Sequence, residues 1–322
     1  MSDSQPNSPP LLLSWLRLLR LPNVFTAVAD IAMGYLIVRR EIDLPGAFAC
    51  LMFASACVYT AGMVLNDVFD FDTDSQERPF RPLPAGQISL RWARYIGVAL
   101  LLVGTGLGIA AGHLGTPAET IARPWRSGIV VLILAGSVLA YDGFLKRTLL
   151  GPLGMGFCRF FNVLLGMSVA DQVALPPWPL GYDLTNLGPA TGIGVYIVGV
   201  TCFARGEAGR SPVLQLLLGS IIMTGGIVIL GWSAQFFQRP ELKIEVFWWL
   251  LALLQVFVLR RCLPAITNPQ PHNVQAAVKQ SILSLILFDA SLCAAASNPM
   301  YALAVAMLLA PMLFLGRWVY ST

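Results

Sequence analysis

The sequence predicts an all-α protein, a polytopic bundle of transmembrane helices. Two observations support this prediction. Hydrophobic residues make up 56% of the 322 residues and charged residues only 12%, with a mean hydropathy of +0.70, whereas soluble domains carry about 25% charged residues. The hydrophobic residues also gather in stretches of about 20 residues, the length that an α-helix needs to cross a bilayer. The net charge of +4 is too small to indicate nucleic-acid binding.

The chain is expected to begin with a segment outside the membrane. Residues 1–20 start with a polar tail and then mix leucines with Trp15, Arg17 and Arg20. This mixture is typical of a short amphipathic helix that lies at the membrane interface. Residues 21–322 are expected to form one transmembrane domain.

The transmembrane domain contains ten apolar segments. They lie at residues 21–38, 46–67, 90–112, 127–143, 149–170, 187–205, 212–235, 244–262, 277–296 and 299–317. Only Asn298, Pro299 and their neighbours separate the last two segments, which predicts a tight hairpin. The alternative there is one long, broken helix, which would leave nine spans.

The distribution of Lys and Arg predicts the orientation in the membrane. If the N-terminus lies in the cytoplasm, fourteen of the 21 Lys and Arg residues fall in inside segments and six in outside loops, while Arg159 falls within a span. Cytoplasmic loops are generally enriched in these residues. We therefore expect an integral membrane protein with the loop after the second span on the cytoplasmic side.

That loop begins with a concentration of acidic residues. Four aspartates occur within eight positions. If the helix of the second span continues to Asp74, its period of 3.6 residues turns Asp72 away from the others. The residues that then share one face are Asn66, Asp67, Asp70 and Asp74. Clustered carboxylates need a neutralising cation, and Mg²⁺ prefers carboxylates and substrate phosphates, so these three aspartates are candidate magnesium ligands.

Basic residues follow the aspartates at Arg78 and Arg81. Guanidinium groups bind phosphate oxygens through paired hydrogen bonds, so the two arginines could bind the diphosphate of a metal–diphosphate pair. Two other interpretations are open. The aspartates could be a solvated helix end, and the arginines could be anchors that only set the topology.

The pattern Asn66-Asp67-x-x-Asp70-x-x-x-Asp74, followed by Arg78-Pro79-x-Arg81-Pro82-Leu83-Pro84-x-Gly86, resembles the first signature of the UbiA superfamily of intramembrane prenyltransferases. The resemblance implies a helical bundle around a central cavity with a cytoplasmic cap. It also implies catalysis by Asn66, Asp70 and Asp74 with Mg²⁺ as cofactor and a prenyl diphosphate as donor.

Lys146 is a further candidate from the same resemblance. It lies in a Tyr-x-x-x-x-Lys-Arg pattern at the end of the fourth span, where family members carry a lysine that contacts the diphosphate. An interfacial lysine that extends its ammonium group to water is the alternative.

Arg159 and Asn162 lie within the fifth span. An arginine inside a membrane needs a partner or a watery cavity, so both residues are candidates for binding the diphosphate or a polar acceptor. Asp30 and Asp289 are intramembrane acids that could instead pair with Arg159 in a purely structural role. These charged residues are also the only support for a third function, an ion-coupled transporter.

The loop after the sixth span departs from the family pattern. Most members carry a second aspartate motif there, Asp-x-x-x-Asp, but this chain has Phe203-Ala204-Arg205-Gly206-Glu207-Ala208-Gly209-Arg210. Glu207 is then a candidate metal ligand, and Arg205 and Arg210 could bind the second phosphate beside a single Mg²⁺. An unusual donor or a loss of catalysis are the alternatives. This stretch resembles a bacterial branch of EboC-like proteins, so a bacterial inner membrane is expected.

The resemblance implies an enzyme that moves an isoprenoid group from a prenyl diphosphate to an aromatic or other lipophilic acceptor. Membrane lipids would surround it, and Tyr141, Phe157 and Phe161 could shield the allylic cation. The alternative is a non-catalytic protein on the same scaffold that binds or transports lipids, which the degenerate second motif favours.

Overall fold

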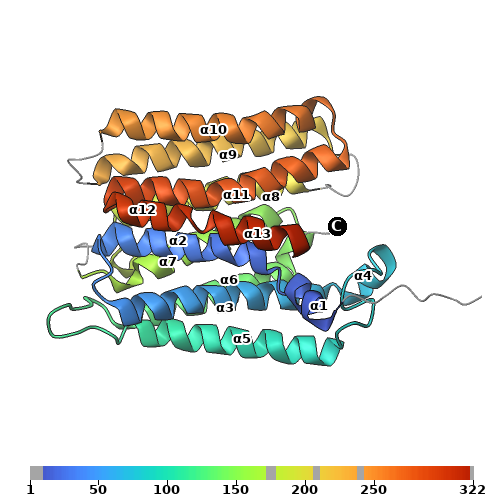
Figure 1. Cartoon of the computed structure of the whole chain (residues 1–322), viewed down its shortest axis with the longest axis horizontal. Coiled ribbons are helices and arrows are strands. Elements are labelled where there is room, and N and C mark those ends of the chain that lie inside the picture. Colours follow the sequence, from blue (N-terminus) through green and yellow to red (C-terminus); the bar gives the residue numbers. More distant parts are fainter. Residues whose placement is uncertain (1–9, 172–178, 206–210, 238–242, 320–322) are drawn as a thin grey trace, which may run out of the picture.

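The protein is a bundle of ten membrane-length helices that lie side by side (Figure 1), as a computed structural model shows. The structure describes residues 10–171, 179–205, 211–237 and 243–319. Within these ranges every regular element is a helix and no strand occurs. The expected all-α transmembrane bundle and its ten spans are therefore confirmed.

The first five crossings form one half of the bundle. A short helix, α1 (Leu11–Leu18), precedes them at the position of the expected amphipathic helix. The crossings are α2 (Leu21–Arg39), α3 (Pro45–Phe69), α5 (Leu90–Ala111), α6 (Trp125–Gly143) and α7 (Gly151–Gly166), which continues into the 3₁₀ turn η2 (Met167–Val169). Between them lie α4 (Phe71–Glu77) and the 3₁₀ turn η1 (Leu145–Arg147).

The second half contains the other five crossings. They are α8 (Leu184–Ala204), α9 (Val213–Ser233), α10 (Ile244–Thr267), α11 (Pro271–Ala296) and the pair α12 (Pro299–Ala306) and α13 (Leu309–Val319). Two further 3₁₀ turns, η3 (Pro179–Gly181) and η4 (Ala234–Phe236), lie at the ends of α8 and α9.

The end of the chain forms the predicted hairpin, and the alternative of one long, broken helix is not found. A tight hairpin joins α11 to α12, and the Asn298 side chain caps α12 by accepting a hydrogen bond from the Met300 amide at 3.0 Å. The tenth crossing is itself interrupted between α12 and α13. Pro311 explains this break because it has no N–H to donate to the Met307 carbonyl, which accepts from the Ala310 amide instead.

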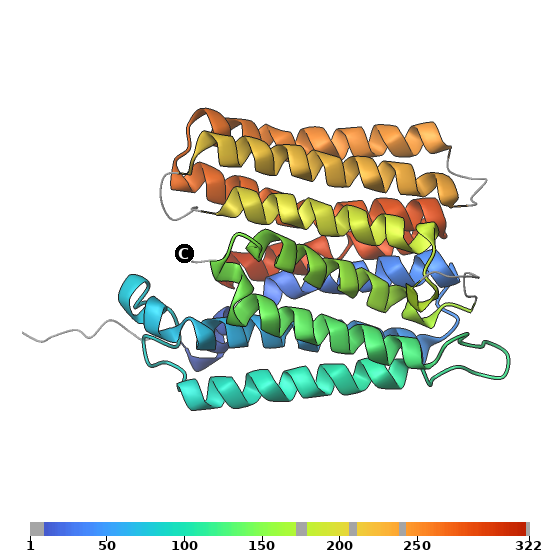
Figure 2. The same ribbon diagram turned by 180° about the vertical axis from the view of Figure 1, so that it is seen from behind.

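Helices α2 and α7 lie at the centre of the bundle. In each of them 72% of the apolar window is buried, against 22% in α5 and 17% in the last crossing. Figure 1 places α5 and α10 at opposite edges, and Figure 2 shows α6, α7 and α8 on the reverse side. The central pair therefore connects the two halves, while the outer helices present apolar side chains to lipid.

The crossing of α2 and α7 depends on glycine. A Cβ atom added to Gly34 would lie 2.6 Å from the Val163 carbonyl oxygen, and one added to Gly166 would lie 2.6 Å from the Ile31 carbonyl oxygen. Small residues allow helix backbones to approach closely in membranes, where packing drives association. The two glycines thus determine how close the central helices lie.

A second, smaller apolar cluster covers the end of the bundle where α1 and α4 lie. Its buried members are Leu18, Val64, Leu83, Ile88 and Ala93, which come from α1, α3, the loop after α4 and α5. The Ser14 hydroxyl of α1 donates to the Gln87 side chain at 2.7 Å. This cluster attaches α1 and the loop to the membrane crossings. We call this end of the bundle the acidic end.

We expect Gly34→Ala to destabilise the protein by about 1–3 kcal/mol, the usual cost of overpacking. The added methyl group would meet a carbonyl oxygen of α7, which cannot move away as a flexible side chain would. The matched control is Gly136→Ala, because nothing lies within 4 Å of the added atom there. Thermal unfolding in detergent should separate the two variants, and equal midpoints would contradict the proposed packing.

Candidate active site

The acidic stretch follows a kink rather than the continuous helix that we expected. Helix α3 ends at Phe69, and Asp70 adopts φ −94° and ψ 4° before α4 begins. Backbone hydrogen bonds still run through the kink, from the Asp70 amide to the Asn66 carbonyl at 3.0 Å and from the Asp74 amide to the Asp70 carbonyl at 2.8 Å. Asp74 is consequently buried, and Asp72 is exposed, as predicted.

Two arginines neutralise Asp67 and Asp74. The Arg81 guanidinium lies 2.6 Å from Asp74 Oδ2 and 3.6 Å from Asp67 Oδ1, and Arg20 bonds Asp67 Oδ1 at 2.9 Å. Burial, the largest single effect, would lower the pKa of Arg20, but Asp67, Tyr59 and Asp74 together outweigh it, so the pKa of Arg20 lies above its ordinary value. Arg20 reaches the site because the chain turns between α1 and α2 there, with φ 44° and ψ 42°.

Lys146 and Arg147 neutralise the other side of the cluster. The Lys146 ammonium donates to Asn66 Oδ1 at 2.8 Å and to Asp70 Oδ2 at 2.7 Å. Arg147 donates to Asp70 Oδ1 at 3.2 Å and to the Phe69 carbonyl at 3.3 Å. The turn η1, which directly follows α6, therefore presents both cations to the end of α3.

The carboxylates are divided between these two groups of cations. Asp67 and Asp74 share Arg81, whereas Asp70 and Asn66 share Lys146. Within the described ranges no group of three or more His, Cys, Asp or Glu side chains is arranged to hold a metal ion. The structure thus brings the four predicted residues to one place, and their role as metal ligands stays a prediction.

The remaining predicted cations also lie at the acidic end where they are described. Arg78 directly follows α4, and its amide donates to the Asp74 carbonyl at 2.8 Å. The Arg205 guanidinium donates to the Thr148 carbonyl, one residue beyond Arg147. The end of α8 therefore contacts the loop after α6. Glu207 and Arg210 lie outside the described residues.

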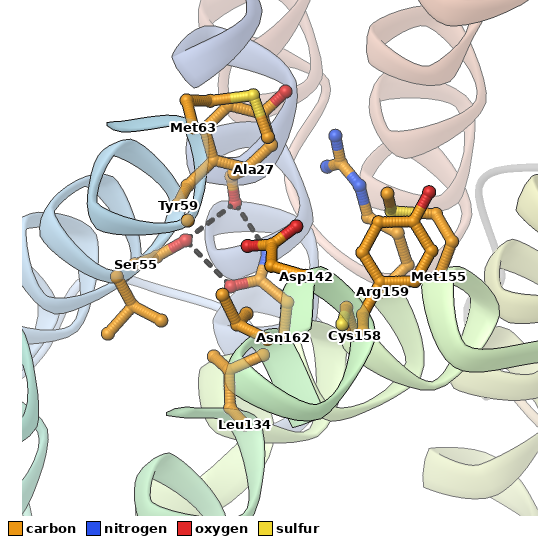
Figure 3. A pocket seen from close by; sticks show the side chains of 14 residues that line it. Ala27, Ser55, Tyr59, Met63, Leu134, Asp142, Met155, Cys158, Arg159 and Asn162 are labelled. Carbon is orange, nitrogen blue, oxygen red and sulfur yellow. Dashed lines mark hydrogen bonds between the residues drawn. The ribbon is translucent and has the colours of Figure 1, made fainter. Parts of the chain in front are cut away.

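A pocket lies beneath the cluster between α2, α3, α6 and α7 (Figure 3). Its empty volume is about 490 Å³, including its mouth. Its lining residues are Ala27, Ser55, Val58, Tyr59, Gly62, Met63, Leu134, Val138, Tyr141, Asp142, Met155, Cys158, Arg159 and Asn162. Of the three aromatic residues predicted to shield a cation, only Tyr141 lines it, and Phe157 is exposed on the outer surface.

Arg159 and Asn162 form a buried network at the wall of this pocket. Arg159 donates to Asp30 at 2.8 Å and to the Thr26 hydroxyl at 2.6 Å. Asn162 donates to Asp30 at 3.0 Å and accepts from the Ser55 hydroxyl at 2.7 Å. Asp30 is therefore the partner of Arg159, as the structural alternative predicted, and the role of both residues in binding diphosphate stays a prediction.

Asp289 extends this network from α11. It is fully buried, and neither of its carboxylate oxygens has a hydrogen-bond partner among the described residues. Asp30 and Arg159 are the charged groups that interact with it electrostatically.

Sequence reasoning missed two residues of the site. Arg20 was expected only as an anchor of the interfacial helix, and Asp142, which lines the pocket, was given no role. A local motif reveals neither residue, since both act through neighbours that are distant in the sequence. A basic residue just before the first span is a signal that could have identified Arg20.

These observations define an integral membrane protein with a charged cluster above an apolar pocket. Residues 27–203, more than half of the chain, match the model of the UbiA prenyltransferase family. The chain therefore belongs to the UbiA prenyltransferase family.

Curated relatives include proteins named digeranylgeranylglyceryl phosphate synthase. The one from Saccharolobus solfataricus is 32% identical over 138 residues, which cover 42% of this chain and 44% of that protein. The one from Methanocaldococcus jannaschii is 38% identical over 95 residues, 29% of this chain and 33% of that protein. The chain thus spans less than half the length of these two relatives.

Solved structures of UbiA homologues share the fold. The homologue from Archaeoglobus fulgidus bound to GPP and Mg²⁺ superposes with a TM-score of 0.63 at 13% identity, over 91% of this chain and 99% of that one. The apo homologue from Aeropyrum pernix K1 gives a TM-score of 0.64 at 16% identity, over 84% and 97% of the two chains.

Removing the arginine of the buried network should destabilise the protein. We expect Arg159→Met to cost about 3–5 kcal/mol, because Asp30 would remain in the bundle without its cation. Adding Asp30→Asn to this variant should restore much of the loss. Thermal unfolding of the single and double variants in detergent tests this, and an Arg159→Met protein as stable as the wild type would contradict it.

Proposed function

We propose that this protein is an intramembrane prenyltransferase that transfers an isoprenoid group from a prenyl diphosphate. The observation that carries the proposal is the cluster of acidic and basic side chains directly above a pocket between α2, α3, α6 and α7. A prenyl diphosphate has the same division into a charged head and an apolar tail. Its diphosphate would lie in the cluster and its tail would enter the pocket.

The cationic side chains would bind the diphosphate. Arg81, Lys146 and Arg147 each satisfy a carboxylate now, and a diphosphate would compete for the same N–H donors. Arg78 and Arg205 lie at the same end and could bind its outer oxygens. Because charge develops on the departing diphosphate, donors fixed around it stabilise the transition state.

The donor chemistry of the acidic residues fits Mg²⁺. Asp67, Asp70, Asp74 and Asn66 offer only oxygen ligands at one end of the bundle, which is the preference of this ion. These residues would hold the metal, and structures of a UbiA homologue bound to GPP and Mg²⁺ or to DMAPP and Mg²⁺ support the choice of ion. Bound Mg²⁺ would neutralise part of the diphosphate charge.

The degenerate second motif is compatible with one metal ion in this proposal. In the sequence between α8 and α9, Glu207 is the only acidic residue where the resemblance implies two aspartates, and Arg205 and Arg210 flank it. Arginines could supply positive charge to the second phosphate instead of a second ion.

The acceptor that we propose is the hydroxyl group of a glyceryl phosphate lipid. The curated relatives are named for the synthesis of digeranylgeranylglyceryl phosphate, so an acceptor of this class is favoured over an aromatic one. We also propose that the acidic end faces the cytoplasm of a bacterial inner membrane, since the excess of Lys and Arg residues on that side supports this orientation.

A second candidate is a lipid-binding or lipid-transport protein without turnover. The division of the carboxylates between two groups of cations favours it, since every acid of the cluster is already neutralised. Tight binding of geranylgeranyl diphosphate without any product, across glyceryl phosphate and aromatic acceptors, would select this candidate.

We expect Mg²⁺-dependent transfer from labelled geranylgeranyl diphosphate in membranes that contain the protein. Asp70→Asn should lower turnover roughly 100-fold, the usual cost of removing one group that stabilises transition-state charge. Asp72→Asn is the matched control because Asp72 is exposed and bonds none of these groups. Equal turnover by Asp70→Asn and the wild type, or full turnover in EDTA, would contradict the proposed mechanism.

A further inference from the structure

Asp142 is a buried acid whose position the proposed binding of the diphosphate does not explain. It lies near the end of α6, is 2% exposed and lines the pocket. No hydrogen bond joins its carboxylate to another residue in the described part of the chain. In Figure 3 this carboxylate projects into the pocket among the side chains that line it.

The level of Asp142 in the bundle follows from its neighbours on α3. Its Oδ2 lies 3.6 Å from the position that a Cβ atom of Gly62 would occupy, so the carboxylate packs against bare backbone. One helical turn further along α3 is Asn66, and four residues after Asp142, in η1, is Lys146, which bonds Asn66. Asp142 is therefore about 5 Å, or one turn, deeper than the layer that contacts the diphosphate.

The charged cluster acts on Asp142 across this short distance. The groups that interact with it electrostatically are Lys146, Asp70, Arg20 and Asp67. Met63 also lines the pocket, and its sulfur lies 3.9 Å from the Arg20 guanidinium. Asp142 consequently lies at the junction between the cluster and the pocket, where the first carbon of a bound prenyl group would lie.

The other acids near the site are already hydrogen-bonded. Asp67 and Asp74 bond arginines, Asp70 bonds Lys146, and Asp30 bonds Arg159. Among the residues lining the pocket, Asp142 is the only carboxylate. Its carboxylate oxygens therefore remain available to accept a hydrogen bond from a molecule in the pocket.

We propose that Asp142 is the general base of the transfer reaction and accepts the proton of the acceptor hydroxyl. This inference rests on the proposed function. The bond between the first prenyl carbon and the diphosphate oxygen breaks, and the diphosphate keeps the electron pair. The acceptor oxygen forms the new bond to that carbon, and its proton passes to Asp142.

The test compares hydroxyl and thiol acceptors. The donor is geranylgeranyl diphosphate, and the acceptors are geranylgeranylglyceryl phosphate and its analogue with a thiol in place of the free hydroxyl. A thiol ionises near pH 8.5, so it needs far less help from a base. Asp142→Asn should lower kcat about 100-fold or more with the hydroxyl acceptor and less than about 10-fold with the thiol, with an unchanged Mg²⁺ requirement.

Two controls separate catalysis from folding. Asp72→Asn makes the same chemical change on an exposed residue and should leave both rates unchanged. Asp142→Glu keeps a carboxylate and should retain more activity with the hydroxyl acceptor than Asp142→Asn. Geranylgeranyl diphosphate should bind all variants with the wild-type affinity.

Other results would overturn the inference. They are full activity of Asp142→Asn, an equal loss with both acceptors, or a raised Mg²⁺ requirement, which would indicate a metal ligand instead. A wild-type protein that transfers to neither acceptor would refute the proposed function itself, so the two failures can be distinguished.

Discussion

The architecture of the acidic end depends on pairing opposite charges where the membrane meets water. Lys146 links the end of α6 to the end of α3 through Asn66 and Asp70, and Arg20 links the start of α2 to Asp67. Charges at this depth are costly without partners. The same pairs therefore fix the positions of the three helix ends and gather N–H donors and carboxylate oxygens at one end of the bundle.

The membrane-spanning helices could be predicted from the sequence because a crossing requires a certain length of apolar residues. All ten predicted segments correspond to helices, and the hairpin at Asn298 was also predicted. Two breaks were not predicted. The kink at Asp70 has no proline or glycine to mark it, and the effect of Pro311 on the last crossing could be recognised only after the hydrogen bonds of α12 and α13 were known.

The candidate site was predictable where its residues form a local pattern. Asn66 and Asp70 do lie with Lys146, although 76 residues separate Asp70 from Lys146 in the sequence. Helical periodicity could not reveal that Arg81 bridges Asp67 and Asp74. Arg81 lies in the loop after α4, and a loop has no regular repeat from which the position of its side chains could be predicted. The choice of Asp30 over Asp289 as the partner of a buried arginine also depends on packing, which the sequence does not state.

The small apolar cluster beneath α1 shares no member with the large one inside the bundle. Regions with separate cores open independently and at different free energies. On warming, α1 and the loop after α4, which the smaller cluster attaches to the crossings, would therefore detach before the helices of the large cluster separate.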